Sequence, residues 1–256
     1  MDDSTATNKP DLTTPDQPDD TTARVRPVLD VIGLLRDGTI RVAFQRIIDL
    51  GTDDVIGYEA LARFPGEVVS PGPWFAEAKV QGLDKELEVA AVKAALACLD
   101  RLPAEVFLAV NVSPLTAASP ALFELLVSVE AARVVLEIKE GEAIEAYPQF
   151  STAFDELRSS GVRIAVDDAG MADVSLRHML DVRPDIIKID VDVTRGIEHD
   201  PIKQTIAATF GSLAARAGAL SLAEGVETKD ELAMLRTLGI AAGQGYLFGR
   251  PEYLPA

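Results

Sequence analysis

The stretch RIAVDDAG, residues 163–170, decides the fold, because an apolar run of strand-forming residues passes directly into two adjacent acids and a glycine. Two carboxylates about 4 Å apart repel by about 4 kcal/mol at an effective dielectric constant near 20. A buried strand that ends in Asp167 and Asp168 therefore needs a cation nearby. Both acids can reach the same end of the strand only if the strand stops there, and Gly170 permits that turn.

Seven further apolar runs recur along the chain, and most are continuous rather than alternating, which indicates strands buried on both faces. Helical patterns separate most of these runs, as in folds built from parallel strands. Together with the run at 162–169, the predicted strands lie at 41–49, 55–63, 106–113, 133–140, 185–190, 220–227 and 243–249, and clear helical patterns at 84–102, 121–132 and 201–218.

Eight strands in this arrangement predict an α/β fold, a (β/α)8 TIM-like barrel with an irregular start. Only LGTDD, residues 50–54, joins the first two strands. This connection is too short for a crossover helix, so the two strands are expected to form an antiparallel hairpin. A doubly wound open sheet is the structural alternative, but no glycine-rich phosphate-binding sequence follows the first strand.

Composition and charge indicate how the chain is divided and which partners and sites are unexpected. Residues 1–24 are rich in Thr, Asp and Pro and predict a disordered tail, and residues 25–256 are predicted to form the barrel domain. The formal net charge of −17 argues against a nucleic-acid polymer or an anionic membrane as partner. A single cysteine, Cys98, excludes an intrachain disulfide and a cysteine-rich zinc site. No apolar run reaches the ~18 residues of a membrane span, so no membrane insertion and a cytoplasmic location are expected.

Polar residues come late in seven of the eight predicted strands or directly after them, where a barrel of this kind has its active site. A single acid at such a position is often a helix cap or a solvated loop residue, but this repetition favours a common site. The polar residues are Glu59, Asn111, Glu137, Glu140, Asp167, Asp168, Lys188, Asp190, Glu224 and Glu227, with Gln244 at the start of the last strand.

This donor set predicts a metal site. Carboxylate and amide oxygens suit Mg²⁺ or Mn²⁺, and a carboxylate shared by two ions about 4 Å apart suits phosphoryl chemistry. Lys188 could orient a water or a phosphate oxygen, or could form a salt bridge inside the barrel. Arg63 shares a strand face with Glu59 and Leu61, which places a cation that could bind phosphate beside a predicted ligand.

Seven short motifs in order give the chain a family resemblance. From residue 40 to about residue 252 it resembles the EAL-domain family of cyclic di-GMP phosphodiesterases. A three-letter EAL alone would carry little information, but the ordered series is specific. The motifs are YEALAR (58–63), NVS (111–113), LEIKE (136–140), DDAG (167–170), IKID (187–190), AEGVET (223–228) and GQGYLFGRP (243–251).

The resemblance implies metal-dependent hydrolysis of cyclic di-GMP to linear pGpG by a homodimer with two Mg²⁺ or Mn²⁺ ions. Glu224 is implied as the base or water-orienting group, with Lys188 assisting, and Glu140 as a brace for the loop after the fifth strand. The implied ligands of the first metal are Glu59, Asn111, Glu137 and Asp167, those of the second are Asp167 and Asp168 with Glu224 nearby, and the implied substrate-binding residues are Gln45, Leu61, Arg63, Asp190, Gln244 and Pro251.

The chain departs from the family's usual sequence mainly after the two aspartates. Ala169 stands in place of the usual phenylalanine, and residues 171–174 read MADV. Lys139 and Arg46 replace a usual threonine and proline. These departures leave open a receptor or interaction module that binds cyclic di-GMP with little or no turnover. A barrel glycosidase with two carboxylates is a third hypothesis, which Lys188 and the scarcity of aromatic residues (5%) disfavour.

Overall fold

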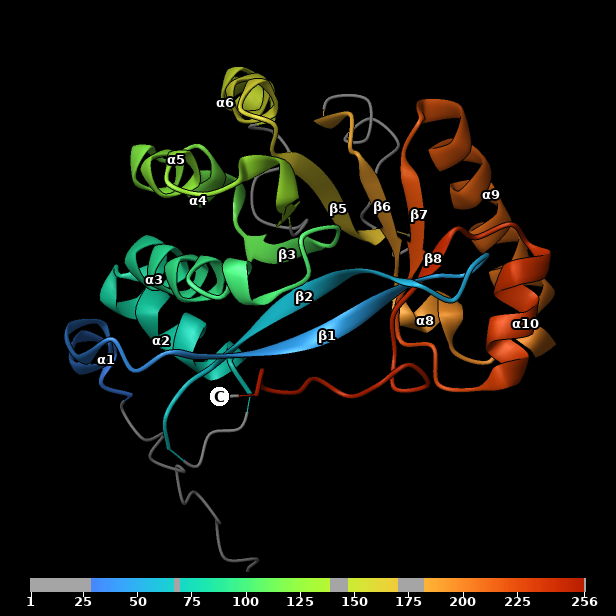
Figure 1. Ribbon diagram of the computed structural model, residues 1–256, viewed down its shortest axis with the longest axis horizontal. Coiled ribbons are helices and arrows are strands. Elements are labelled where there is room, and N and C mark those ends of the chain that lie inside the picture. Colours follow the sequence, from blue (N-terminus) through green and yellow to red (C-terminus); the bar gives the residue numbers. More distant parts are fainter. Residues whose placement is uncertain (1–28, 67–69, 139–146, 170–181, 256) are drawn as a thin grey trace, which may run out of the picture.

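The computed structural model describes residues 29–66, 70–138, 147–169 and 182–255, and of residues 147–149, 168 and 169 it describes the backbone alone. Eight strands close into one barrel in sequence order (Figure 1). The predicted (β/α)8 barrel is therefore confirmed. The strands are β1 (Arg41–Asp49), β2 (Val55–Arg63), β3 (Phe107–Val112), β4 (Val134–Ile138), β5 (Arg163–Ala169), β6 (Ile186–Ile189), β7 (Leu220–Ala223) and β8 (Ala242–Gly243).

The irregular start of the barrel is also confirmed. β1 pairs antiparallel with β2 on one side and antiparallel with β8 on the other. The remaining pairs, from β2·β3 to β7·β8, are parallel. The pairing of β5 with β6 is irregular between Val166 and Ala169, so the strand that carries the two aspartates continues to Ala169 with a bulge instead of stopping at the acids.

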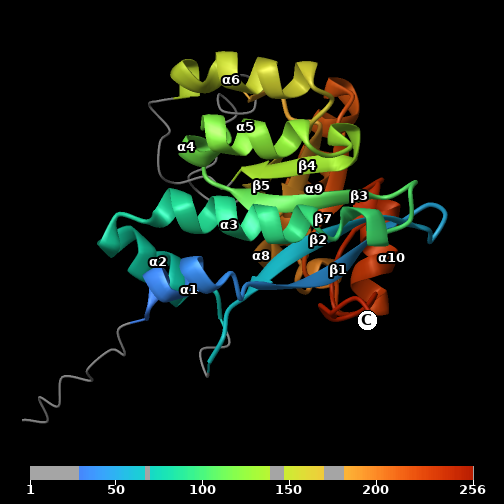
Figure 2. The ribbon, with the colours of Figure 1, turned by 60° about the vertical axis from the view of Figure 1, so that its left-hand side comes forward.

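Helices cover the outside of the barrel on two sides. α3, α4, α5 and α6 lie along β3 to β5, and α9 and α10 lie beside β6 to β8 (Figures 1 and 2). In the described part of the chain, no helix combines the length and the apolar character that crossing a membrane requires. The helices are α1 (Val31–Asp37), α2 (Gly72–Gln81), α3 (Asp84–Leu96), α4 (Pro114–Ala117), α5 (Pro120–Val127), α6 (Tyr147–Ser159), α8 (Val191–Thr194), α9 (Pro201–Ala217) and α10 (Lys229–Thr237), with short 3₁₀ turns η1 (Leu99–Arg101), η2 (Ala131–Arg133) and η4 (Ile197–His199).

The last strand is much shorter than the sequence suggests. The apolar run at 243–249 predicts a strand, but β8 ends at Gly243. The chain turns because Gly245 lies against the backbone of Val226, where a Cβ atom would come within 2.1 Å of the Val226 carbonyl oxygen. Further along, Glu252 forms an antiparallel bridge with Phe44, so the C-terminal segment continues the wall that β8 begins.

This contact gives a testable expectation for stability. Gly245→Ala should lower the free energy of unfolding by about 3 kcal/mol, because the new methyl group must displace backbone instead of a flexible side chain. Gly72→Ala is the matched control, since the nearest atom to its Cβ would be 3.8 Å away and alanine favours the helix that starts there. Chemical unfolding of both variants measures the difference, and equal stabilities would contradict the role of Gly245.

Candidate active site

A polar layer lies at the mouth of the barrel, directly above an apolar layer. Side chains two residues apart on a strand share a face, so each interior residue is followed by another on the same side. The apolar layer contains Ile47, Ala109, Val135, Ala165, Ile186, Leu222 and Ala242. Two positions nearer the mouth, the strands or their ends carry Gln45, Asn111, Glu137, Asp167, Lys188, Glu224 and Gln244, and Glu59 joins them from β2.

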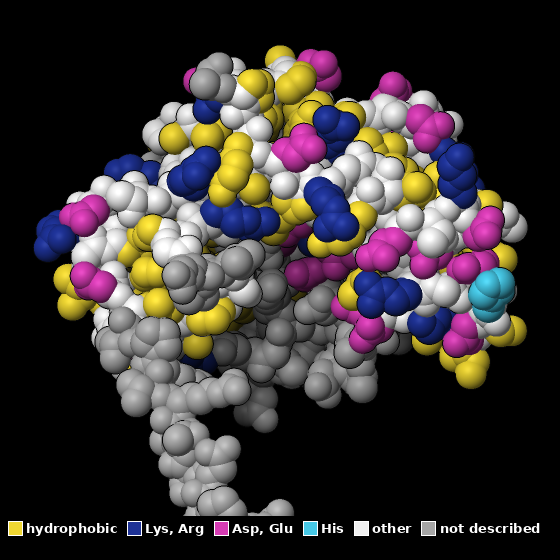
Figure 3. Space-filling view, turned by 90° about the horizontal axis from the view of Figure 1, so that it is seen from below, with side chains coloured by type: hydrophobic (Ala, Val, Ile, Leu, Met, Phe, Trp, Pro, Cys, Tyr) yellow, Lys and Arg dark blue, Asp and Glu magenta, His cyan; other side chains and the backbone are white. Residues whose placement is uncertain are grey.

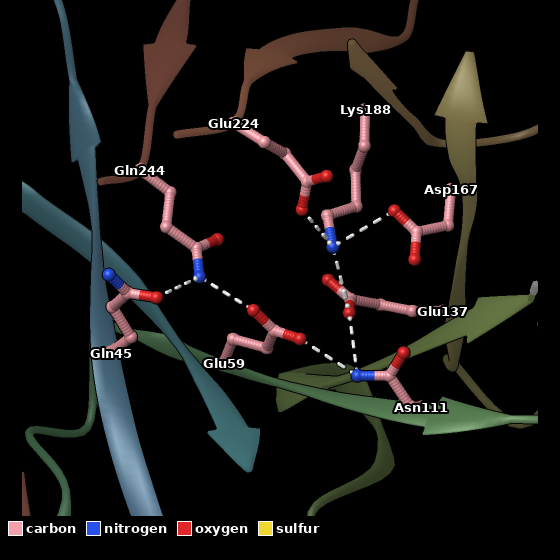
Figure 4. A network of polar contacts seen from close by, with 8 residues as sticks. All are labelled: Gln45, Glu59, Asn111, Glu137, Asp167, Lys188, Glu224 and Gln244. Atoms are coloured by element: carbon pink, nitrogen blue, oxygen red, sulfur yellow. Dashed lines mark hydrogen bonds and ion pairs between the residues drawn. The ribbon is translucent and has the colours of Figure 1, made fainter. Parts of the chain in front are cut away.

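Lys188 is at the centre of this layer (Figure 4). Its side chain is 1% exposed, and Nζ lies 3.0 Å from Glu137 Oε2, 3.3 Å from Asp167 Oδ1 and 2.7 Å from Glu224 Oε1. One ammonium group therefore contacts acids from three different strands or strand ends. Removing charges from water is costly, so such a group is stable only because its partners are charged and close.

Glu59 is held from both sides by amide groups. Asn111 Nδ2 donates to Glu59 Oε1 over 2.8 Å, and Gln244 Nε2 donates to Glu59 Oε2 over 2.6 Å. The same Gln244 nitrogen donates to Gln45 Oε1, and the same Asn111 nitrogen donates to Glu137 Oε2. Register explains these contacts, since Gln45 is the cross-strand partner of Glu59 and Asn111 is the partner of Glu137. The amides thus connect the acids into one network.

Burial and crowding shift the pKa values of this network in both directions. Burial, reinforced by the neighbouring acids, raises the pKa of Glu137 well above its usual value, and burial raises the pKa of Glu224 to about 7 although Lys188 opposes the shift. Burial also works against ionisation of Glu59, but Lys188 and the two amide donors lower its pKa. For Lys188, burial is outweighed by the four surrounding carboxylates, which raise the pKa well above the usual value. The acids outnumber the single ammonium group of Lys188, so carboxyl groups with a raised pKa keep protons that a further cation would displace.

The raised pKa of Glu224 sets the direction of a pH effect. The pKa of Glu224 is about 7 in the folded protein against an ordinary 4.5, so between these pH values the folded protein holds a proton that the unfolded chain has released. Stability without metal should therefore fall by up to about 3 kcal/mol as pH rises from 4.5 through 7. Thermal unfolding in chelator between pH 5 and 8 measures this slope. Glu224→Gln should make the slope shallower because its amide does not titrate, and a midpoint that rises with pH in wild type would contradict the assignment.

Two cavities open onto the polar layer. The first, of about 370 Å³, reaches from Glu59, Asn111, Asp167 and Lys188 to apolar residues of α2 and α3. The second, of about 330 Å³, lies on the other side of Glu59. Both are lined by Glu59, Leu61 and Glu224. Three predicted substrate-binding residues, Gln45, Leu61 and Gln244, line the second cavity.

The other predicted site residues lie elsewhere or outside the described residues. Asp190 follows β6 and caps α8, with Oδ1 accepting from Asp192 N over 2.6 Å. Arg63 donates to the Ala62 carbonyl oxygen, and neither Arg63, Asp190 nor Pro251 lines the two cavities. Glu140, residues 171–174, the tail at 1–24 and the side chain of Asp168 lie outside the described residues.

The oxygen donors of the polar layer fit a hard divalent cation in chemical type. Glu59, Asn111, Glu137 and Asp167 come from four adjacent strands and are close enough to share hydrogen-bond or ion-pair partners. Among the described side chains, however, no three acids, histidines or cysteines are arranged as a cation site. One oxygen each of Glu137 and Asp167 faces Lys188 Nζ, whereas both oxygens of Glu59 accept from amide groups. A metal ion held by Glu137 and Asp167 would therefore compete with this ammonium group.

Two acids outside the mouth support it from behind, and neither was predicted from the sequence. Glu88 on α3 accepts from Ser113 N and Oγ over 2.9 and 2.8 Å, which fixes the end of the strand that carries Asn111. Glu231 on α10 accepts from backbone N–H groups of two loops at the mouth. TKDE at 228–231 is a capping-box sequence that indicates the local bonds of Glu231. No local pattern indicates its contact with Gly196.

Comparison with known proteins agrees with this architecture. The EAL domain family matches residues 30–251. The cyclic di-GMP phosphodiesterase PdeF of Escherichia coli K12 is 30% identical over 211 residues, which are 77% of this chain and 28% of PdeF. The chain therefore spans under a third of the length of that relative.

Solved structures give the same result. Klebsiella pneumoniae BlrP1 in a calcium and cyclic di-GMP complex has 30% identity and a TM-score of 0.76, covering 85% of this chain and 57% of BlrP1. BlrP1 has also been solved with manganese and cyclic di-GMP. The PaMucR phosphodiesterase in complex with cyclic di-GMP has 26% identity and a TM-score of 0.77, covering 88% of this chain and 98% of that structure. With a closed eight-stranded barrel, a buried acidic mouth and a family match over most of its length, the chain belongs to the EAL domain family.

Proposed function

We propose that this chain hydrolyses cyclic di-GMP to linear pGpG in a reaction that requires Mg²⁺ or Mn²⁺. The observation that carries the proposal is the polar layer, in which three buried carboxylates, the partly exposed Glu224 and one buried lysine lie together at the mouth of the barrel. The named activity of PdeF and the bound cyclic di-GMP, calcium and manganese of BlrP1 support it. A phosphodiester substrate is anionic, so it would approach such a mouth only with cations present.

The residues divide into ligands and catalytic groups. Glu59, Asn111, Glu137 and Asp167 would hold one divalent cation, and Asp167 with Asp168 would hold a second near Glu224. When bound, the cations neutralise phosphate charge and lower the pKa of a coordinated water. Gln45, Leu61 and Gln244 would contact the substrate in the second cavity, and Arg63, Asp190 and Pro251 would do so from its surroundings. Glu140 would brace the loop after β5.

Glu224 is the proposed base. A carboxylate with a pKa of about 7 is well matched to accept a proton from water at neutral pH. Its Oε1 atom lies 2.7 Å from Lys188 Nζ, which orients the carboxylate and can stabilise negative charge on the phosphate. Water attacks the phosphorus atom, one P–O ester bond breaks, and the leaving ribose oxygen takes up a proton. Opening one of the two phosphodiesters gives a linear dinucleotide.

The test is hydrolysis by the purified chain. Cyclic di-GMP is incubated with the protein and Mn²⁺, Mg²⁺ or chelator, and the nucleotides are separated by chromatography. Formation of pGpG with Mn²⁺ or Mg²⁺ but not with chelator is expected. PdeF serves as the positive control, and no product under conditions in which PdeF works would reject the proposal. Calorimetric binding of cyclic di-GMP without product would instead identify a receptor, the alternative suggested by the sequence AGMADV at 169–174.

We also propose that the active form is a homodimer, as the family resemblance implies. Specific activity measured against protein concentration tests this proposal together with the reaction. A specific activity that rises with concentration and then reaches a plateau is expected. Activity that is independent of concentration, at concentrations where sedimentation shows a monomer, would reject the dimer while leaving the reaction intact.

A further inference from the structure

Two loops form one wall of the second cavity. The first loop, residues 190–196, follows β6, includes the short helix α8 and contributes Val191 and Arg195. The second loop follows β7 and contributes Glu224, Gly225 and Glu227. β6 and β7 are paired up to Ile189 and Ala223, and Glu224 N adds one bond to the Ile189 carbonyl oxygen. Beyond that point the pairing of β6 with β7 no longer sets the spacing of the two loops, although Val226 N donates to the Gln244 carbonyl oxygen next to β8.

Val193 of the first loop and Val226 of the second belong to one buried apolar cluster, and two further contacts join the loops directly. Gly225 lies so close to Val191 that a Cβ atom would come within 2.2 Å of Val191 Cγ2. Arg195 and Glu227 form an ion pair of 3.4 Å, but their side chains are 61% and 44% exposed. Exposed ion pairs of this kind contribute little to stability. The face drawn in Figure 3 likewise shows acidic and basic side chains interspersed at the surface, where water screens them.

Glu231 joins the same two loops from behind. It is 3% exposed, and its Oε1 atom accepts from Gly196 N over 2.9 Å. Its Oε2 atom accepts from Glu227 N over 2.8 Å and from Thr228 N over 2.9 Å. One carboxylate therefore holds backbone from both sides of the cavity wall. Hydrogen bonds to a buried ionised acceptor are stronger than those between neutral groups.

We propose that Glu231 is a positioning residue for substrate binding, because its carboxylate holds the two loops at the spacing that the second cavity requires. This inference rests on the proposed function, since the cavity is taken to bind part of cyclic di-GMP. Glu231 contacts neither cavity and is not a catalytic residue. Glu224 is held separately by Lys188 and by its own backbone bond to Ile189, so loosening the wall should affect binding more than chemistry.

Two substitutions break the clamp to different extents. In Glu231→Gln, one amide oxygen can still accept from Glu227 N and Thr228 N, but an NH₂ group then faces the N–H of Gly196. Glu231→Ala removes all three bonds. We expect KM for cyclic di-GMP to rise about threefold in the glutamine variant and about tenfold in the alanine variant, the latter corresponding to about 1.4 kcal/mol. kcat should stay within about twofold of wild type.

Thr228→Ala is the matched control. Thr228 Oγ1 accepts from Glu231 N and caps α10, so its loss destabilises the same helix end while the carboxylate keeps its three donors. The control should lower the melting temperature without raising KM. A KM rise in the control as large as in Glu231→Ala, or an unchanged KM in Glu231→Ala, would overturn the proposal.

Hydrogen exchange separates failure of this proposal from failure of the proposed function. The Gly196 amide should exchange faster in Glu231→Gln than in wild type, because its acceptor is lost, whereas Thr228→Ala should leave it unchanged. Equal protection in wild type and in Glu231→Gln overturns the clamp whether or not the protein is active. If the Gly196 amide exchanges faster in Glu231→Gln than in wild type, but wild type produces no pGpG and binds no cyclic di-GMP, the proposed function is rejected, and with it the role of Glu231 in substrate binding.

Discussion

Glu59→Gln is expected to lower kcat/KM for cyclic di-GMP roughly a thousandfold, which corresponds to about 4 kcal/mol of transition-state stabilisation. The substitution keeps the shape of the side chain but removes the negative charge proposed to bind the metal. It also breaks the local network. Both oxygens of Glu59 accept from amide nitrogens, of Asn111 and Gln244, so a glutamine must point its own NH₂ group at one of these donors.

The measurements for this variant are hydrolysis and metal affinity, the latter by calorimetric titration with Mn²⁺ in the absence of nucleotide. Glu124→Gln is the control, because it removes one charge from an exposed acid on α5 and should leave both quantities unchanged. A melting temperature in chelator checks that the variant is folded. If Glu59→Gln binds Mn²⁺ as tightly as wild type and turns over at a similar rate, Glu59 is not a metal ligand.

The placement of Glu59 could be predicted because a strand repeats every two residues. The polar residues at the strand ends stand two positions after barrel-interior apolar residues, as Glu137 does after Val135 and Asp167 after Ala165. Their convergence then follows from closing the barrel. The antiparallel hairpin could be predicted for a different local reason, because the connection at residues 50–54 is too short for a crossover helix.

Three features of the structure could not be predicted from strand periodicity. The apolar run at 243–249 has the composition of a strand, but Gly245 contacts Val226, and the chain turns. Asp190 shares the alternation of Lys188, yet β6 ends at Ile189 and its carboxylate caps α8 instead. The long side chain of Lys188 reaches acids on both sides of its own strand, and strand periodicity gives its direction but not its reach.

Lys188→Met is expected to lower the free energy of unfolding of the metal-free protein by about 3–5 kcal/mol at pH 8. Methionine has a similar length and is apolar, so the change isolates the charge. Without the ammonium group, the acids that it contacts, Glu137, Asp167 and the partly exposed Glu224, repel one another with no cation among them. The variant should also lose most of its hydrolytic activity, since Lys188 is proposed to orient Glu224.

Two conditions should restore the stability of Lys188→Met. Lowering the pH protonates acids whose pKa is already raised by burial, so the deficit relative to wild type should shrink as pH falls from 8 toward 5. Adding Mn²⁺ supplies the missing positive charge, so the metal should raise the melting temperature of the variant more than that of wild type. Lys93→Met, on the exposed surface of α3, is the control and should show neither effect.

The two restoring conditions distinguish an electrostatic role of Lys188 from simple packing. A packing defect would persist at every pH and would not respond to Mn²⁺, because neither condition changes the shape of the methionine side chain or of its surroundings. If Lys188→Met were instead more stable than wild type without metal, the acids around Lys188 would have to be protonated in the metal-free wild type. The expected pattern follows from charge: Lys188 neutralises Glu137 and Asp167 until divalent cations bind them, so the lysine and the metal are alternative partners of those oxygens, while Lys188 keeps its contact with Glu224.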